Sequence, residues 1–164
     1  MNFNNNKGFG KDNSRGKFQE VEREFLFAKK GFVDEKGNLR EDLMTKEAEQ
    51  IANYFGEDQL TKSQLRAFYN EIKAIKNKLS ISKDEDKFSE IYPLILMIKS
   101  KVVYRASRGT PRDKKKMSGI KKFLELGIDQ IKKENGKGKG REAFENFALF
   151  FEVVVGYAYG VLND

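Results

Sequence analysis

Lysine and arginine side chains recur at helical spacing in one stretch of the chain, and side chains of this kind bind phosphate groups. Lys62, Arg66 and Lys73 fall within about 40° of one another when the segment is projected as an α-helix at 100° per residue. Tyr69 shares the stripe, and the only acid of the segment, Glu71, points elsewhere. Cations interleaved with an aromatic ring are typical of a surface that follows a nucleic-acid backbone. A solvated lysine face is the alternative that the same pattern allows.

The start of this helix adds a second reason to expect an anion. Thr61-Lys62-Ser63-Gln64 has the Thr-x-x-Gln form of a capping box, which predicts that a helix begins here. The free N–H groups and the macrodipole of a helix start favour a negative charge. Ser63 and Gln64 therefore join Lys62 and Arg66 as candidate phosphate contacts. The capping box competes with this use, because it occupies two of the same N–H groups.

A second basic group follows in residues 99–122, which carry ten bases and one acid. Lys101, Arg105 and Arg108 fall within about 60° of one another on a helical projection. Arginine grips a phosphate with two hydrogen bonds, but it serves an interhelical ion pair equally well. The lysine run that follows includes Lys121 and Lys122, and such a run also solubilises a surface.

The residue types that are missing exclude several classes of enzyme. The 164 residues contain no histidine, cysteine or tryptophan, so there is no Ser-His-Asp triad, thiol nucleophile, disulfide or His/Cys zinc site. The densest acids, Asp84-Glu85-Asp86, lie in the expected first turn of a helix, where acids are favoured. Successive helical positions do not converge on one metal, so a metal-dependent nuclease is disfavoured. No Walker A sequence occurs, and we expect no cofactor.

The net charge is a small remainder of an uneven distribution. Lysine and arginine number 32 and aspartate and glutamate 25, which gives +7. Residues 41–61 have a net charge of −5, whereas residues 62–80 have +4 and residues 99–122 have +9. The positive charge is therefore concentrated in two segments rather than spread over the chain.

Apolar periodicity predicts the helices that position these charges. We expect an all-α fold, a compact bundle of about five helices joined by short loops. Pro93 should kink the third helix or divide it, and the nearly all-apolar stretch 92–103 should place that helix at the centre of the fold. Ser82-x-x-Glu85 is expected to cap it, and Thr110-Pro111 should begin the fourth helix. The expected helices cover residues 42–55, 61–79, 82–107, 110–135 and 142–162.

The composition also suggests how the chain is divided. Residues 1–18 have almost no aliphatic side chain and are expected to be a disordered basic tail. Residues 19–40 fit a loop or a short helix, and residues 41–164 form the helical bundle domain. The apolar segment 143–162 carries Glu145 and Glu152, so we expect a core helix rather than a membrane span. With no signal peptide at the start, a cytoplasmic location is expected.

Four stretches together resemble the small subunit of type III-A (Csm) CRISPR interference complexes over residues 40–164. The signature helix of that family is matched by Leu60-Thr61-Lys62-Ser63-Gln64-Leu65-Arg66 and then Phe68-Tyr69-x-Glu71-Ile72. Val102-Val103-Tyr104-Arg105-Ala106-Ser107-Arg108 is similar to its apolar-Tyr-x-Ala-Gly-Arg run, with Ser107 where the family often has glycine. Residues 122–131 and 144–159 are similar to its last two helices.

This resemblance implies a non-catalytic, all-helical subunit that acts in antiviral defence. Several copies would stack along the duplex of guide RNA and target RNA, beside backbone subunits that carry the cleavage, with the large subunit capping one end. A guide strand supplies specificity by base pairing, so such a subunit needs only to hold the backbone. A helical module that binds acidic proteins is the alternative. The candidate RNA-binding residues are Lys62, Ser63, Gln64, Arg66, Lys73, Lys101, Arg105, Arg108, Lys121 and Lys122.

Overall fold

The computed structural model describes residues 22–164, so the tail expected at residues 1–18 lies outside the described residues. The five long helices are α3 (Lys46–Glu57), α4 (Lys62–Ser80), α5 (Glu85–Ser107), α7 (Ser118–Asn135) and α8 (Gly140–Ala158). Three short ones are α1 (Phe27–Lys30), α2 (Glu41–Met44) and α6 (Pro111–Lys116). Within residues 22–164 the only β-type pairings are two isolated bridges, Val33 with Leu39 and Thr61 with Asn163. The predicted all-α bundle is confirmed.

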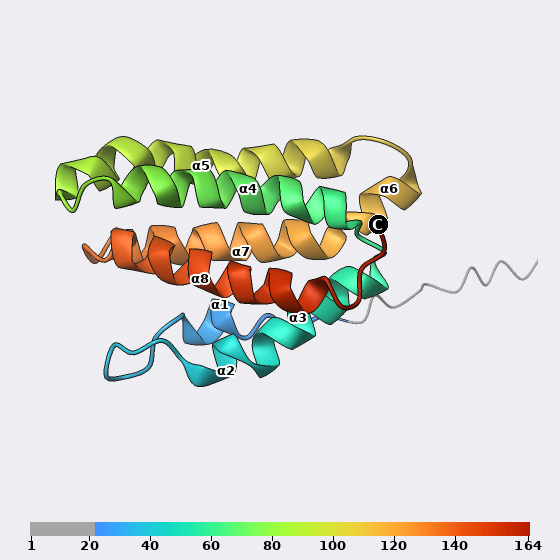
Figure 1. Ribbon diagram of the computed structural model, residues 1–164, viewed down its shortest axis with the longest axis horizontal. Helices are drawn as coiled ribbons and strands as arrows, with labels where there is room; N and C mark the ends of the chain where they lie inside the picture. The colour runs from blue at the N-terminus through green and yellow to red at the C-terminus, as the bar shows by residue number, and fades with distance from the viewer. Residues whose placement is uncertain (1–21) are drawn as a thin grey trace, which may run out of the picture.

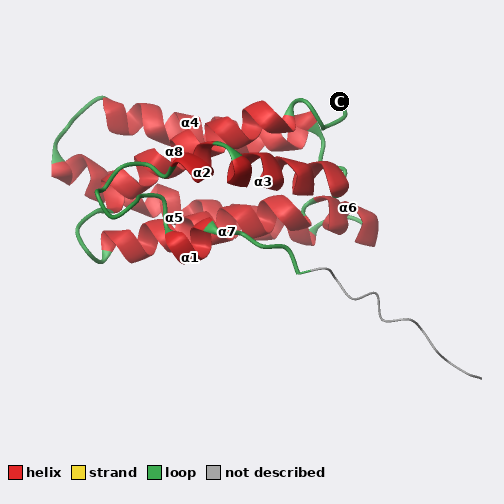
Figure 2. Cartoon of the chain, turned by 90° about the horizontal axis from the view of Figure 1, so that it is seen from below, coloured by secondary structure: helices red, strands yellow, loops and turns green. Residues whose placement is uncertain are grey.

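The helices form three layers (Figure 1). α4 and α5 make one outer layer, α7 and α8 the middle layer, and α1, α2 and α3 the other outer layer. Seen from the side of the last layer, α2 and α3 lie against α8, and α1 lies against α7 (Figure 2). The start of α4, the end of α5, α6, the start of α7 and the end of α8 meet at one end of the bundle, called the α6 end below.

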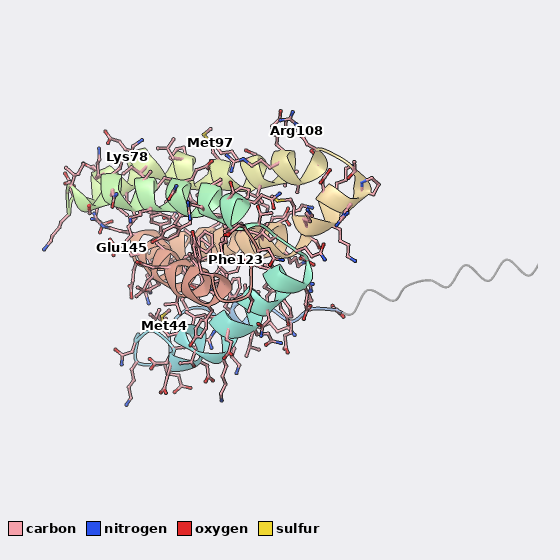
Figure 3. The ribbon with its side chains drawn as sticks, turned by 45° about the vertical axis from the view of Figure 1, so that its right-hand side comes forward. Met44, Lys78, Met97, Arg108, Phe123 and Glu145 are labelled. Atoms are coloured by element: carbon pink, nitrogen blue, oxygen red, sulfur yellow. The ribbon has the colours of Figure 1, made fainter. Side chains whose placement is uncertain are left out.

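Phenylalanine rings fill the space between the layers. Phe123 of α7 is fully buried and lies among the helices in Figure 3. The rings around it have centroids 5.3–5.9 Å from its own and are tilted or edge-on, as aromatic pairs prefer. They belong to Phe27, Phe55, Phe147, Phe150 and Phe151. A Cβ at Gly127 would overlap the Phe147 ring, so this glycine lets α7 and α8 approach closely.

The prediction that α5 occupies the centre of the fold is wrong. α5 lies in an outer layer and buries one face, with Ile95, Ile98 and Val102 among its buried residues. Its opposite side leaves Met97 48% and Tyr104 60% exposed. The apolar run covers the whole circumference of the helix, but α4 and α7 cover only part of it.

α5 also runs unbroken through Pro93, so the alternative of a divided helix is wrong. The carbonyl of Ser89 loses its helical partner because Pro93 has no N–H. Both residues are exposed, so water can reach that carbonyl. The Ser82-x-x-Glu85 capping box is wrong as well. Asp84 is the N-cap, accepting a hydrogen bond from the Asp86 N–H at 3.2 Å, while the Ser82 hydroxyl accepts from the Asp84 N–H.

Two of the expected helices are each divided by one residue. Thr45 separates α2 from α3, and Met117 separates α6 from α7. Thr110 and Asp113 form a reciprocal capping box at the start of α6, where the Thr110-Pro111 motif predicts that a helix begins. Hydrogen bonds from the hydroxyl and the N–H of Thr110 to the Asp113 carboxylate lower the pKa of that group. α8 ends at Ala158, four residues before the expected end. No helix within residues 22–164 is long and apolar enough to span a bilayer.

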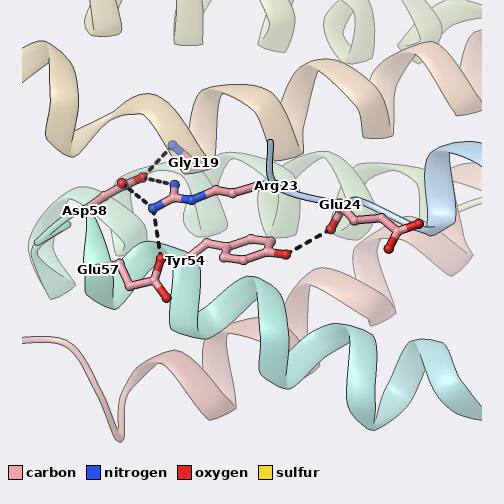
Figure 4. Close-up of polar contacts among 6 residues, drawn as sticks. All are labelled: Arg23, Glu24, Tyr54, Glu57, Asp58 and Gly119. Atoms are coloured by element: carbon pink, nitrogen blue, oxygen red, sulfur yellow. Dashed lines mark hydrogen bonds and ion pairs between the residues drawn. The ribbon is translucent and has the colours of Figure 1, made fainter. Parts of the chain in front are cut away.

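An ion pair attaches the segment before α1 to the bundle at the α6 end (Figure 4). Arg23 donates two hydrogen bonds of 2.7 Å to the Asp58 carboxylate, which is 5% exposed. The bond to Asp58 raises the pKa of Arg23 above its ordinary value. The same carboxylate accepts a 2.7 Å hydrogen bond from the Gly119 N–H. Asp58 therefore caps the start of α7 from another helix, which fixes the direction in which α7 leaves Met117.

Candidate nucleic-acid interface

The basic stripe of α4 lies on the side of that helix that faces the end of α8. Leu65 and Phe68 are among the buried residues of α4, which leaves the stripe at the surface. The Arg66 Nε donates a 3.0 Å hydrogen bond to the Tyr159 hydroxyl, and the guanidinium carbon lies 5.8 Å from the centre of that ring. The Lys62 ammonium pairs with the Asp164 carboxylate at 3.0 Å.

Farther along the stripe, Lys73 is exposed and its ammonium lies 5.8 Å from the centre of the Tyr69 ring. Tyr69 itself packs edge-on against Phe151 of α8. Burial against α8 raises the pKa of the Tyr69 hydroxyl, and the nearby Glu152 carboxylate raises it further. The stripe is free of acids along α4, but α8 brings Glu152 to its border.

The other two candidates of the α4 start differ in their availability. Ser63 is exposed. The Gln64 side-chain oxygen accepts hydrogen bonds from the N–H and the hydroxyl of Thr61, at 3.0 and 3.1 Å. The capping box expected from the sequence is formed. The oxygen of Gln64 therefore holds the start of the helix, and its amide nitrogen is the atom left for other contacts.

Two of the candidate residues on α5, Lys101 and Arg105, share one carboxylate on α4. Arg105 approaches Glu71 at 2.7 Å and Lys101 approaches it at 3.5 Å. The Arg105 guanidinium also lies over the Phe68 ring, 4.6 Å from its centre. Glu71 and Arg66 are about 140° apart around α4. The exposed ridge of α4 therefore separates these two cations from the stripe, and Glu71 offsets one of their charges.

Arg108, the C-cap residue of α5, projects from the α6 end (Figure 3). Its guanidinium carbon lies 5.3 Å from the centre of the Tyr104 ring, and that side chain is 60% exposed. Among residues 22–164, no carboxylate lies within ion-pair distance of Arg108 or Arg66. Each of these arginines instead has a tyrosine ring beside it.

Lys121 and Lys122 lie on a wide groove of about 900 Å³ at the α6 end. Lys114 and Lys115 of α6 line the same groove, across from Val103 and Ser107 of α5. Acids are present too, since Glu22, Glu57, Asp58 and Glu125 also line it. Lys121 lies 4.0 Å from Glu125, so its charge is partly offset.

The structure thus gathers most of the sequence-predicted residues at the α6 end but divides them among three surfaces: the α4 stripe, the α4–α5 border and the groove. Tyr104 and Tyr159 were not among the residues expected from the sequence to take part in the site. Tyr104 lies four residues before Arg108, so helical spacing could have paired them. Tyr159 is 93 residues from Arg66, and only the fold brings them together.

The carboxylates of residues 22–164 form no group of three that could hold a metal ion. Asp84, the first residue of the acidic triplet, uses its carboxylate to cap α5.

A family model described as Csm2 Type III-A matches residues 38–160. Neither the curated proteins nor the solved structures that were compared with the chain gave a significant match. The match spans three quarters of the chain and includes both basic helices and the groove lysines of α6 and α7. With a helical bundle that carries these cations at one end, the chain belongs to the Csm2 family of small structural subunits of type III-A CRISPR complexes.

Proposed function

We propose that this subunit is not catalytic and holds RNA by its backbone through the α6 end, without sequence preference. In the assembled complex the bound strands would be the guide RNA and the target RNA. Arg66 and Arg108 make the central contacts of this proposal. Lys62, Lys73 and the groove lysines (Lys114, Lys115, Lys121 and Lys122) extend these contacts along an RNA strand.

One observation carries the proposal: two exposed arginines that lack a carboxylate partner within residues 22–164 each lie beside a tyrosine ring. A guanidinium of this kind is free to bind a phosphate oxygen, and the ring beside it offers a face on which a base can stack. Arginine in an interhelical ion pair would be satisfied already, as Arg105 is by Glu71. Arg66 and Arg108 are therefore the cations to which an RNA phosphate would supply an anionic partner.

The same proposal includes contacts with other copies of the chain and with the backbone and large subunits. The exposed side of α5 supports it, because apolar side chains recur there at helical spacing. Met97 and Tyr104 lie on this side with Leu96 and Val103, which are 36% and 41% exposed. An apolar helix face of this size is stabilised when another protein surface covers it.

The test is binding of a fluorescein-labelled single-stranded RNA by the whole chain, followed by anisotropy at several salt concentrations. Each phosphate contact to a single strand contributes about −0.7 to the slope of log K against log salt. The double variant Arg66→Ala, Arg108→Ala should therefore have a slope smaller by about 1.4. At 0.1 M salt its affinity should be about 25-fold weaker. RNAs of different sequence should bind equally well.

The matched control is Lys36→Ala, Lys46→Ala, which removes two exposed cations from the loop before α2 and from the start of α3. It should change affinity by less than about twofold, because its charges lie away from the α6 end. Equal losses in the two double variants would refute a defined RNA surface. If the wild-type chain bound no RNA but bound acidic proteins through Arg66 and Arg108, the protein-interaction alternative would replace this proposal.

A further inference from the structure

A separate cavity of about 320 Å³ lies at the end of the bundle opposite the α6 end. Four parts of the chain line it: the segment from Lys29 to Gly37, the last turns of α7, the turn from α7 into α8, and the first turns of α8. Phe32, Val33 and Ala143 give it an apolar floor. Its volume is at the lower limit of small-ligand pockets, which is the size class of a mononucleotide rather than a peptide.

Five lysines and two glutamates line this cavity. Lys137 pairs with Glu134 at 3.3 Å. The other four lysines have no carboxylate within ion-pair distance among residues 22–164. They are Lys29, Lys30, Lys133 and Lys139. Glu142 is the remaining acid on the wall, so the unpaired charge around the cavity is positive and favours an anion.

The chain fixes the walls of the cavity with its own hydrogen bonds. Gly31 has a φ of +71°, and its carbonyl accepts a 2.9 Å hydrogen bond from Arg40. The turn between α7 and α8 is closed by hydrogen bonds from the N–H groups of Lys137 and Lys139 to the Glu134 carbonyl. The lysines are therefore carried by ordered backbone from several elements.

A buried polar side chain also faces this cavity without a full set of partners. Gln130 is 7% exposed and lines the wall. Its amide nitrogen makes one long hydrogen bond, 3.5 Å to Glu134, and its side-chain oxygen has no hydrogen bond among residues 22–164. The side-chain oxygen of Gln130 is not among the buried atoms that lack a partner, so it is accessible and can accept a hydrogen bond from a ligand such as a sugar hydroxyl.

We propose that this cavity binds a phosphorylated ligand of about mononucleotide size, with the phosphate held by Lys133, Lys139 and Lys29. The ligand is either a free nucleotide or the phosphorylated end of an RNA strand, since both present the same group. The site is independent of the RNA surface at the α6 end.

The test uses isothermal titration calorimetry of the whole chain with ATP and with adenosine. ATP should bind saturably at one site per chain, and adenosine should not, because only ATP carries phosphate. Lys133→Ala, Lys139→Ala should weaken ATP binding at least tenfold. The matched control Lys78→Ala, Lys132→Ala removes two exposed lysines that do not line the cavity and should leave it unchanged. Denaturant unfolding of both double variants checks that they fold alike.

A second arm compares decamer RNAs with a 5′-phosphate or a 5′-hydroxyl. A preference for the phosphorylated strand that is lost in Lys133→Ala, Lys139→Ala assigns the site to strand ends, whereas ATP binding without such a preference assigns it to free nucleotides. Absence of both effects would overturn the proposal, as would ATP binding that the Arg66→Ala, Arg108→Ala variant abolishes. Loss of RNA binding at the α6 end with intact ATP binding would count against the proposed RNA function alone.

Discussion

Asp58 joins three parts of the fold, so its removal is a strong test of how the bundle is held together. Its carboxylate accepts two hydrogen bonds from Arg23 and one from the Gly119 N–H. In Asp58→Ala the Arg23 guanidinium loses its main partner, and the start of α7 loses its cap. Both consequences lie at the α6 end, where the candidate RNA contacts are also found.

The size of the effect follows from the exposure of the partners. Breaking a fully buried ion pair costs about 3–5 kcal/mol. The Arg23 side chain is 23% exposed, so water partly replaces the lost carboxylate, and we expect about 2 kcal/mol. Loss of a helix cap costs about 1 kcal/mol more. The free energy of unfolding should therefore fall by about 3 kcal/mol in Asp58→Ala.

Urea denaturation followed by circular dichroism measures this directly. With an m-value of about 2 kcal/mol/M, the midpoint should fall by about 1.5 M. Glu57→Ala is the control, because Glu57 is 63% exposed and approaches the same arginine at 3.2 Å. It should cost no more than about 0.5 kcal/mol. If Asp58→Ala were as stable as Glu57→Ala, the ion pair would have no part in holding the segment before α1.

Three further outcomes follow from other contacts. Asp164→Asn should strengthen RNA binding about two- to fivefold in the anisotropy assay, because it frees Lys62 from its carboxylate partner; unchanged affinity would mean that Lys62 does not touch RNA. The pKa of Asp113 is lowered, so the α6 capping box keeps its full stability above the ordinary aspartate pKa of about 4 and loses it as the pH falls through the lowered pKa of Asp113. The protection factors of the α6 amides, measured by hydrogen exchange, should fall with pH in this way in the wild type but not in Asp113→Asn. Gly127→Ala should lower the free energy of unfolding by about 1–3 kcal/mol, because its methyl group would overlap the Phe147 ring; an unchanged urea midpoint would show that α7 and α8 can separate at no cost.

The helices were predictable from the sequence where local chemistry decides them. The helix starts at Thr61 and Thr110 depend on the local sequence, and both are present. The position of α5 was not predictable in this way. Apolar residues around a whole helix indicate how much of its surface is unfavourable in water. They do not indicate how many neighbouring helices cover that surface in the fold.

The candidate site was also predictable from the sequence only in part. Helical spacing placed Lys62, Arg66 and Lys73 on one side of α4, and it placed Glu71 elsewhere. It did not decide whether Arg105 would bind phosphate or enter an interhelical ion pair; in the structure Arg105 pairs with Glu71. Nor did it show the break at Met117, because the Gly119 N–H is bound by a residue 61 positions away.

The close contact of α7 with α8 makes α7 a rigid spacer. Its 18 residues span about 27 Å, from the groove lysines at one end to the lysine cavity at the other. A mononucleotide reaches only one of these ends. At about 3.4 Å per nucleotide in each strand of a duplex, a strand needs roughly eight nucleotides to contact both. Under the proposed RNA-binding function, the length of one helix would thus set the number of duplex base pairs over which a bound strand contacts both ends.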